Sequence, residues 1–259
     1  MDSGYSYHET CKTSFPPLQS KGEATIQTKK KVLTLKKIKI YGDSILKGVM
    51  FNEELNRYRL FGYKFEELAE NGIEVENNCK MGATIEKGFE IMKDTLDDCD
   101  EDTIVVLEYG GNDCNYNWEA VSDNPEGDFL PNTPAEKFSE IYLKMINYVR
   151  EKGAKVCICN LVPIVSDKFM NFVSQGLNYD NIMKWMGNVN RIARWQEYYS
   201  HLSERVAAIA DCPILDLRSS FLTHDRMENM IGIDGIHPSA EGHTLIREIF
   251  QKNILHTAI

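Results

Sequence analysis

The sequence lacks any continuous apolar segment close to the ~20 residues that a membrane-spanning helix needs. Residues 1–20 are polar and do not contain the apolar core of a secretory signal peptide. We therefore expect a cytoplasmic protein without a membrane partner, unless a leader has been removed. The composition, with 42% hydrophobic and 26% charged residues in 259, is ordinary for a soluble globular chain.

Paired cysteine motifs are also absent. The seven cysteines are odd in number and none is spaced as C-x-x-C, so we expect free thiols and no zinc site. Cys157 and Cys159 lie in an apolar run, where reduced thiols pack as small hydrophobic side chains. We accordingly predict a reducing compartment, no bound metal and no cofactor.

The chain has no excess of positive charge. Its net charge of -10 argues against a nucleic-acid partner. The lysines nevertheless gather near the N-terminus, in a run formed by Lys29, Lys30, Lys31, Lys36, Lys37 and Lys39. Such a run is either a patch for an anionic partner or, as we favour, a solvated face or edge of a strand.

The chain divides into a polar arm at residues 1–31 and one folded domain at residues 32–259. In the domain, strands are predicted at residues 37–41, 73–77, 103–107, 156–161 and 213–217. Helices are predicted at residues 57–70, 85–96, 134–152, about 185–210, and from 238 or 239 onward. This alternation predicts an α/β fold, a three-layer α/β/α sandwich with a flavodoxin-like, parallel five-stranded sheet.

Polar segments follow the predicted strands. Gly42-Asp43-Ser44 ends the first strand, Gly82 follows the second, and a glycine-rich turn with Asn112 follows the third. The segment from Asp234 to His237 lies between the fifth strand and the last helix. Because ligands bind at the carboxyl ends of parallel strands, we expect all of these segments to meet at one edge of the sheet.

Ser44, His237 and Asp234 supply the three groups that nucleophilic acyl transfer requires: a hydroxyl, a base and an acid that orients the base. Asp234 and His237 are three residues apart, so one turn can present both side chains. Pro238 disfavours helical geometry at His237 and keeps that residue in an extended or loop conformation.

These segments resemble the four consensus blocks of the SGNH hydrolases, also called the GDSL esterase/lipase family. The block residues are Ser44 in G-D-S, Gly82 in K-M-G-A-T, Asn112 in G-G-N-D and His237 in D-G-I-H-P. The resemblance covers residues 36–252 and implies that residues 32–259 are an SGNH hydrolase domain. The chain departs from the pattern at Ile45, where leucine is frequent, and before Gly82, where an arginine-like residue is usual.

The resemblance implies a catalytic triad of Ser44, His237 and Asp234, together with an oxyanion hole. The oxyanion donors are expected to be the backbone N–H groups of Ser44 and Gly82 and the side-chain amide of Asn112. Gly82 has no Cβ, so a substrate can approach its backbone closely. The implied reaction is ester hydrolysis through a covalent acyl-enzyme, without a metal.

Several neighbouring residues are predicted to be structural. We expect Asp43 to cap the turn that holds the serine, and Asp113 to brace the loop of Asn112. Cys114 has no paired base in the sequence, and His243 lies in the last predicted helix, so neither is assigned a catalytic role.

Two other function classes are disfavoured. A metallophosphoesterase requires a D-x-H block, which is missing, and a G-D-x-x-D block, which Ile45-Leu46 interrupts. A non-catalytic binding module on the same fold is expected to lose Ser44 or His237, and both residues are present.

Two long irregular segments, 115–132 and 165–184, are expected to border the site and to determine the substrate. Their aromatic side chains beside acids and amides suit sugar rings, and they equally suit ordinary loop packing. We predict a small-molecule substrate, a short-chain O-acyl ester, with an acetylated carbohydrate as the leading candidate. The alternative is a medium-chain thioester or a lysophospholipid. No oligomeric state is predicted.

Overall fold

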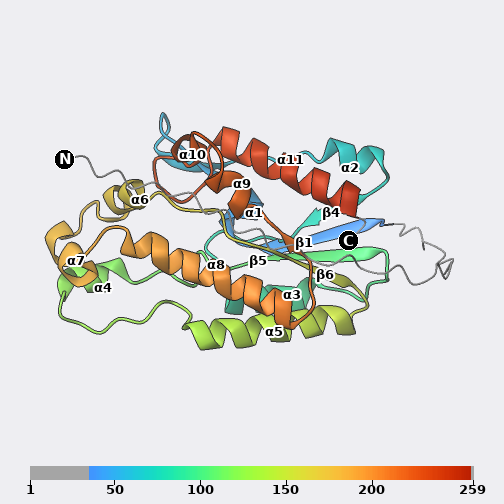
Figure 1. Cartoon of the computed structure of the whole chain (residues 1–259), viewed down its shortest axis with the longest axis horizontal. Coiled ribbons are helices and arrows are strands. Elements are labelled where there is room, and N and C mark those ends of the chain that lie inside the picture. Colours follow the sequence, from blue (N-terminus) through green and yellow to red (C-terminus); the bar gives the residue numbers. More distant parts are fainter. Residues whose placement is uncertain (1–34, 258–259) are drawn as a thin grey trace, which may run out of the picture. The chain divides into compact units, whose positions relative to one another are not determined.

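The computed structural model describes residues 35–257, so the arm predicted at residues 1–31 lies outside the described residues. A five-stranded sheet forms the centre of the described part, and every neighbouring pair of strands is parallel (Figure 1). The strand order is β4-β1-β5-β6-β7. Counted along the sheet-forming strands this is the order 2-1-3-4-5, which is the flavodoxin-like arrangement. The predicted fold class is therefore confirmed. The strands are β1 (Lys37–Gly42), β4 (Glu74–Asn77), β5 (Thr103–Glu108), β6 (Lys155–Cys159) and β7 (Ile214–Leu215).

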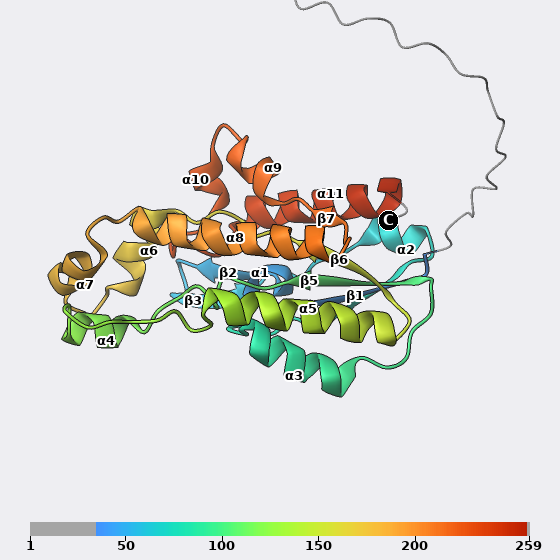
Figure 2. The ribbon, with the colours of Figure 1, turned by 60° about the horizontal axis from the view of Figure 1, so that its bottom comes forward.

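Helices cover both faces of this sheet, because strand side chains alternate between the faces. Helices α2 and α11 lie on one side of the sheet, and α3 and α5 lie on the other (Figures 1 and 2). Ile38 and Ile40 pack in the core that includes residues of α2 and α11, whereas Tyr41 packs in the core that includes residues of α3, α5 and α8. Among residues 35–257, no helix combines the length and apolar character needed to cross a membrane. The helices are α1 (Ser44–Lys47), α2 (Glu66–Glu70), α3 (Ile85–Thr95), α4 (Trp118–Asp123), α5 (Ala135–Glu151), α6 (Ser166–Val173), α7 (Tyr179–Met186), α8 (Arg191–Ile209), α9 (Arg218–Leu222), α10 (Met227–Met230) and α11 (Ala240–Thr257).

The prediction of one helix over residues 57–70 is wrong. An antiparallel hairpin of β2 (Val49–Asn52) and β3 (Arg57–Leu60) comes first, and only the short helix α2 follows. Phe51 and Tyr58 are directly opposite each other in the hairpin, and their ring centroids lie 5.2 Å apart. This cross-strand aromatic pair stabilises the hairpin, and a helix over residues 57–70 would remove it.

The prediction of one long helix over residues 185–210 is also wrong, because α7 and α8 are separate helices. Gly187 ends α7 with a left-handed φ of 71°. Helices also occupy much of the two segments predicted to be irregular, since α4 lies in the first and α6 and α7 in the second.

The aromatic side chains of these two segments form a small core of their own. Tyr116, Trp118 and Phe169 are at most 9% exposed and pack against residues of α7 and α8. Of the two interpretations left open by the sequence, ordinary packing therefore describes these three side chains.

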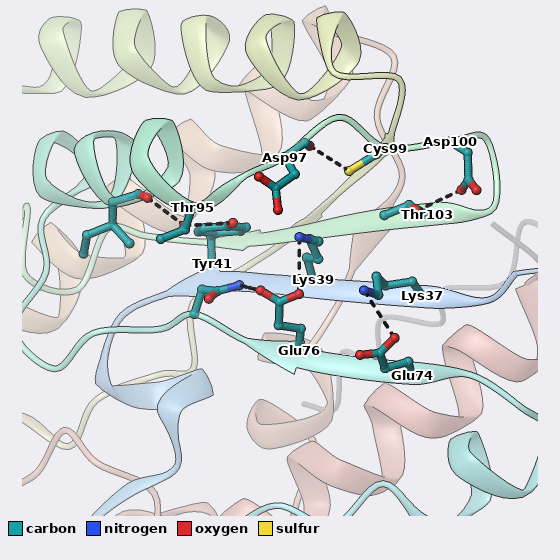
Figure 3. Close-up of polar contacts among 12 residues, drawn as sticks. Lys37, Lys39, Tyr41, Glu74, Glu76, Thr95, Asp97, Cys99, Asp100 and Thr103 are labelled. Carbon is teal, nitrogen blue, oxygen red and sulfur yellow. Dashed lines mark hydrogen bonds and ion pairs between the residues drawn. The ribbon is translucent and has the colours of Figure 1, made fainter.

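The lysines of β1 lie in the amino-terminal half of the sheet, away from the carboxyl ends of the strands. Lys37 pairs with Glu74 and Lys39 pairs with Glu76 of the neighbouring strand, each at 3.2 Å (Figure 3). Lys36 pairs with Asp102 at 2.7 Å. These lysines therefore pair with carboxylates of their own chain, as the strand-face interpretation expects, while residues 29–31 lie outside the described part.

Candidate active site

Ser44 lies where β1 ends and α1 begins. Asp43 is the N-cap residue of α1 and accepts a hydrogen bond from the backbone N–H of Ile45 at 2.9 Å, which confirms its predicted capping role. A Cβ at Gly42 would lie 2.9 Å from the carbonyl oxygen of Glu108, so the close pairing of β1 with β5 requires glycine there. The turn therefore presents the Ser44 hydroxyl at the carboxyl edge of the sheet.

Asp234 and His237 lie in the loop between α10 and α11. One carboxylate oxygen of Asp234, Oδ1, accepts the backbone N–H groups of Ile236 at 3.1 Å and of His237 at 3.0 Å. The other oxygen, Oδ2, lies 2.6 Å from His237 Nδ1, and His237 Nε2 lies 2.8 Å from Ser44 Oγ. Asp234, His237 and the sequence-remote Ser44 thus form one continuous hydrogen-bonded chain.

The Asp234 carboxylate is stabilised in its charged form. Burial opposes ionisation, but the hydrogen bond and charge of His237 and the two backbone N–H groups lower the pKa of Asp234. With Asp234 charged, Nδ1 of His237 carries a proton and Nε2 faces the serine hydroxyl.

Gly82 and Asn112 border the same cavity as Ser44. Gly82 has a left-handed φ of 75°, and no protein atom lies within 4 Å of the place where a Cβ would be. The backbone conformation, and not crowding by the protein, therefore favours glycine here. The Asn112 side-chain nitrogen donates to Asp43 Oδ2 at 3.0 Å and to the carbonyl oxygen of Ala83 at 3.1 Å.

Three carboxyl groups at this edge of the sheet are buried: Asp43 and Glu108, which line the cavity, and Asp113 are each at most 1% exposed. The pKa of Glu108 is raised well above its usual range, mainly by burial and secondly by the charge of the neighbouring Asp43. Burial raises the pKa of Asp113 to about 7. Asp113 also accepts the backbone N–H of Ile85 at 3.0 Å, which ties the Asn112 loop to α3 as predicted.

Sequence reasoning missed two residues of the site. Glu108 is the last residue of an otherwise apolar strand, and a buried acid at such a strand end is the signal that could have identified it. Tyr58 of the hairpin places its ring 5.0 Å from that of His237. No pattern in the sequence indicated this contact, because residues 57–70 had the spacing of a helix.

The cavity beside Ser44 has a volume of about 130 Å³. Apart from the polar groups near Ser44, apolar side chains form most of its wall. Gln196, the polar side chain on α8, already donates to the carbonyl oxygen of Val162 and accepts from Arg218. The apolar lining consists of Ile45, Met81, Leu161, Val162, Ile164, Phe169, Ile192 and Ile236.

Cys114 and His243 have structural surroundings. Cys114 borders the cavity, but burial raises the pKa of its thiol, which disfavours a thiolate nucleophile. His243 is fully buried in α11, and its two ring nitrogens contact the Tyr63 hydroxyl at 2.7 Å and the Val49 carbonyl oxygen at 2.9 Å. It therefore joins α11 to the base of the hairpin.

Comparison with known protein families identifies the chain. A family model described as the GDSL-like Lipase/Acylhydrolase family matches residues 40–245. The chain belongs to this family. The family that the four sequence blocks resembled is thus confirmed, and no curated protein sequence matches the chain.

Solved structures of family-like proteins share the fold at low sequence identity. A lipase/acylhydrolase from Enterococcus faecalis is 19% identical with a TM-score of 0.58, covering 85% of this chain and 95% of that one. The acetyl xylan esterase AlAXEase is 21% identical with a TM-score of 0.54, covering 84% and 99%. A mutant of Axe2, an acetyl-xylooligosaccharide esterase from Geobacillus Stearmophilus, is 16% identical with a TM-score of 0.57, covering 85% and 94%.

Proposed function

We propose that the protein is a serine esterase that hydrolyses short-chain O-acyl esters through a covalent acyl-enzyme. The observation that carries this proposal is the hydrogen-bonded chain from Asp234 through His237 to Ser44, with distances of 2.6 and 2.8 Å. Membership of a hydrolase family supports the reaction type. Ser44 and His237 both border the cavity, so a substrate bound there reaches the nucleophile.

In the proposed mechanism, His237 Nε2 takes the Ser44 proton as Oγ attacks the carbonyl carbon of the ester. His237 then donates that proton to the departing alcohol oxygen, which leaves an acyl group on Ser44. A water molecule, deprotonated by His237, releases the carboxylic acid and regenerates the serine. Asp234 stays ionised throughout and stabilises the imidazolium that forms in each half-reaction.

The proposed oxyanion hole consists of the backbone N–H groups of Ser44 and Gly82 and the side-chain amide of Asn112. The Asn112 nitrogen already has Asp43 and the Ala83 carbonyl oxygen as acceptors. The amide is thus held beside the nucleophile turn, and in the transition state one of its two N–H groups would donate a bifurcated hydrogen bond to the oxyanion and to its present acceptor. Loss of one such donor costs about 10²–10³ in kcat.

The volume of the cavity supports a short acyl group. An apolar cavity of about 150 Å³ holds one benzene molecule, which has six carbons. The cavity of about 130 Å³ beside Ser44 therefore suits an acyl group of up to about six carbons. A medium-chain acyl group of eight or more carbons would extend out of the open side of this cavity, and the acyl-chain series described below tests that alternative.

An acetylated carbohydrate remains the narrower prediction within this class. The printed names of two structural relatives are those of acetyl xylan or acetyl-xylooligosaccharide esterases. The burial of Tyr116 and Trp118 removes two of the aromatic side chains that suggested sugar stacking. Acetate release from acetylated xylooligosaccharides tests this narrower prediction directly.

The proposed function is tested by comparing wild type, Ser44→Ala and the matched control Ser139→Ala on p-nitrophenyl esters of two to twelve carbons. Ser139 lies on α5, and its hydroxyl donates to the carbonyl oxygen of Ala135 one turn earlier in the same helix. We expect hydrolysis to peak at six carbons or fewer, Ser44→Ala to lose at least 10³-fold in kcat, and Ser139→Ala to match wild type. A fluorophosphonate is expected to form its adduct on Ser44. Activity of Ser44→Ala within tenfold of wild type would show that the nucleophile is misassigned, and a peak at eight carbons or more would exclude the short-chain assignment.

A further inference from the structure

The hairpin of β2 and β3 extends directly from the nucleophile turn. Helix α1 ends at Gly48, which has a left-handed φ of 82°, and β2 begins at the next residue. The hairpin is a separate two-stranded sheet that does not pair with the five-stranded sheet. Its base is fixed by the contact between the Val49 carbonyl oxygen and His243 of α11.

One face of the hairpin is joined to the catalytic loop by aromatic rings. Phe51 contacts Phe172 of α6 with a centroid distance of 5.2 Å, and it contacts Tyr58 at the same distance. The Tyr58 ring in turn lies 5.0 Å from the His237 ring at an interplanar angle of 64°. Tyr58 is therefore supported from behind and covers the imidazole edgewise.

The Asp234 carboxylate is also close enough to the Tyr58 hydroxyl for its charge to raise the pKa of Tyr58. A carboxylate has about four acceptor positions, and three donors come from the loop of Asp234 itself, namely two backbone N–H groups and His237 Nδ1. Tyr58 approaches the carboxylate from a different part of the chain. The pKa of Tyr58 is raised to about 12, mainly by burial and secondly by the charge of Asp234. The hydroxyl therefore retains its proton at neutral pH.

We propose that Tyr58 is a positioning residue for the reaction, whose ring and hydroxyl together hold His237 and Asp234 in the orientation that serves Ser44. The ring restricts rotation of the imidazole and keeps water from one side of the hydrogen bond between His237 and Asp234. The hydroxyl completes the acceptor positions of the carboxylate and moderates its negative charge. This inference rests on the proposed serine-esterase function.

Two substitutions separate the contributions of ring and hydroxyl. Tyr58→Phe keeps the ring and removes the donor, whereas Tyr58→Ala removes both. For Tyr58→Phe we expect kcat to fall about three- to tenfold with KM unchanged, and for Tyr58→Ala about 10- to 100-fold. In Tyr58→Phe the Asp234 carboxylate loses the proposed donor, so its charge interacts more strongly with His237 and the imidazolium is favoured. The acid limb of the kcat/KM profile should therefore move to higher pH, by up to about one unit.

The pH profile distinguishes positioning from a loss of hairpin stability. The other charged or titratable groups that interact with His237 are Asp43 beside the nucleophile, Asp234 on the same loop and His243 on α11. None of them is altered in either variant. A merely structural role for Tyr58 would lower the amount of active enzyme without moving the acid limb.

Arg59→Ala is the matched control for the hairpin, because Arg59 is the exposed neighbour of Tyr58 on the opposite face of β3. We expect its kcat and pH profile to match those of wild type. The rate at which a fluorophosphonate labels Ser44 is measured for every variant alongside circular dichroism. Should wild-type Ser44 not be labelled, the proposed function fails. If wild type is labelled normally and Tyr58→Phe has the same labelling rate, kcat and acid limb as wild type, the proposed role of Tyr58 is wrong. If Tyr58→Ala does not fold, Tyr58→Phe alone decides.

Discussion

Gly235 is one of the two residues between Asp234 and His237, and its replacement by alanine should damage both stability and activity. Gly235 is buried and has a left-handed φ of 74°. Its carbonyl oxygen accepts the backbone N–H of Val165 at 2.9 Å. A Cβ at this position would lie 2.7 Å from the Val165 carbonyl oxygen and 2.7 Å from the Phe169 Cα, and closer still to the Phe169 nitrogen. The loop from Asp234 to His237 is therefore packed directly against the backbone of α6.

Two costs add in Gly235→Ala. A left-handed conformation costs an alanine about 1–2 kcal/mol relative to glycine. Relieving the overlap with the α6 backbone requires a shift of about 1 Å, since carbon atoms make contact at about 3.5 Å, and such overpacking costs about 1–3 kcal/mol. Alanine also reduces the entropy of the unfolded chain, which stabilises the folded state by about 0.4–1 kcal/mol. We expect a net loss of about 2–4 kcal/mol in the free energy of unfolding.

Gly176→Ala is the matched control, because Gly176 has a similar φ of 80° and no atom within 4 Å of the Cβ position. It carries the conformational cost without the overlap. Urea unfolding should therefore show Gly235→Ala to be less stable than Gly176→Ala by about 1–3 kcal/mol. Because a misplacement of about 1 Å costs about 100-fold in rate, kcat of Gly235→Ala should fall by that factor while Gly176→Ala stays at wild type. Equal stability of the two variants, or an unchanged kcat in Gly235→Ala, would refute this account of the loop.

Two further predictions concern buried titratable groups. Burial lowers the pKa of His243 to about 4, so its stabilising contribution is complete above pH ~6.5 and is lost as the pH falls toward 4. Between pH 7 and 4, wild type should therefore lose up to about 3 kcal/mol more unfolding free energy than His243→Gln, and parallel pH curves would contradict this. Glu108→Gln keeps a hydrogen-bond donor for Asp43 and should retain kcat within about fivefold, whereas Glu108→Ala should lose about tenfold or more. Equal kcat values for the two variants would show that Glu108 does not support the site.

The sheet and the meeting of Ser44, Asp234 and His237 at its carboxyl edge could be predicted because local signals determine them. β5 is a continuous buried run of branched apolar residues, and the order of four short blocks along the chain placed the site at the carboxyl edge. The Asp234 turn is likewise local, since its carboxylate binds backbone N–H groups two and three residues ahead. Such features depend on neighbouring residues, so periodicity and spacing reveal them.

The hairpin could not be predicted, because its stability depends on contacts with remote segments. Leu60, Phe61, Phe65 and Leu68 have nearly helical spacing, which favoured the wrong assignment. The competing contacts join Phe51 to Phe172 and Tyr58 to His237, across more than 100 residues of sequence. Since Tyr58 reaches the site only through this hairpin, the error in secondary structure and the missed site residue have one cause.

The buried carboxyl groups explain how the nucleophile turn and the Asn112 amide are kept in register. Asp43 binds the Ile45 N–H with one oxygen and the Asn112 side chain with the other, so a single carboxylate positions both groups. Burying that charge is costly, and the cost is offset only where donors surround it. Glu108, held in its neutral form by burial and by Asp43, can supply a donor without adding a second charge. The proposed nucleophile and the proposed oxyanion donor therefore depend on one buried carboxyl group, that of Asp43. Substitutions at Asp43 and Asn112 should consequently have non-additive effects on kcat, which a double-mutant cycle would measure.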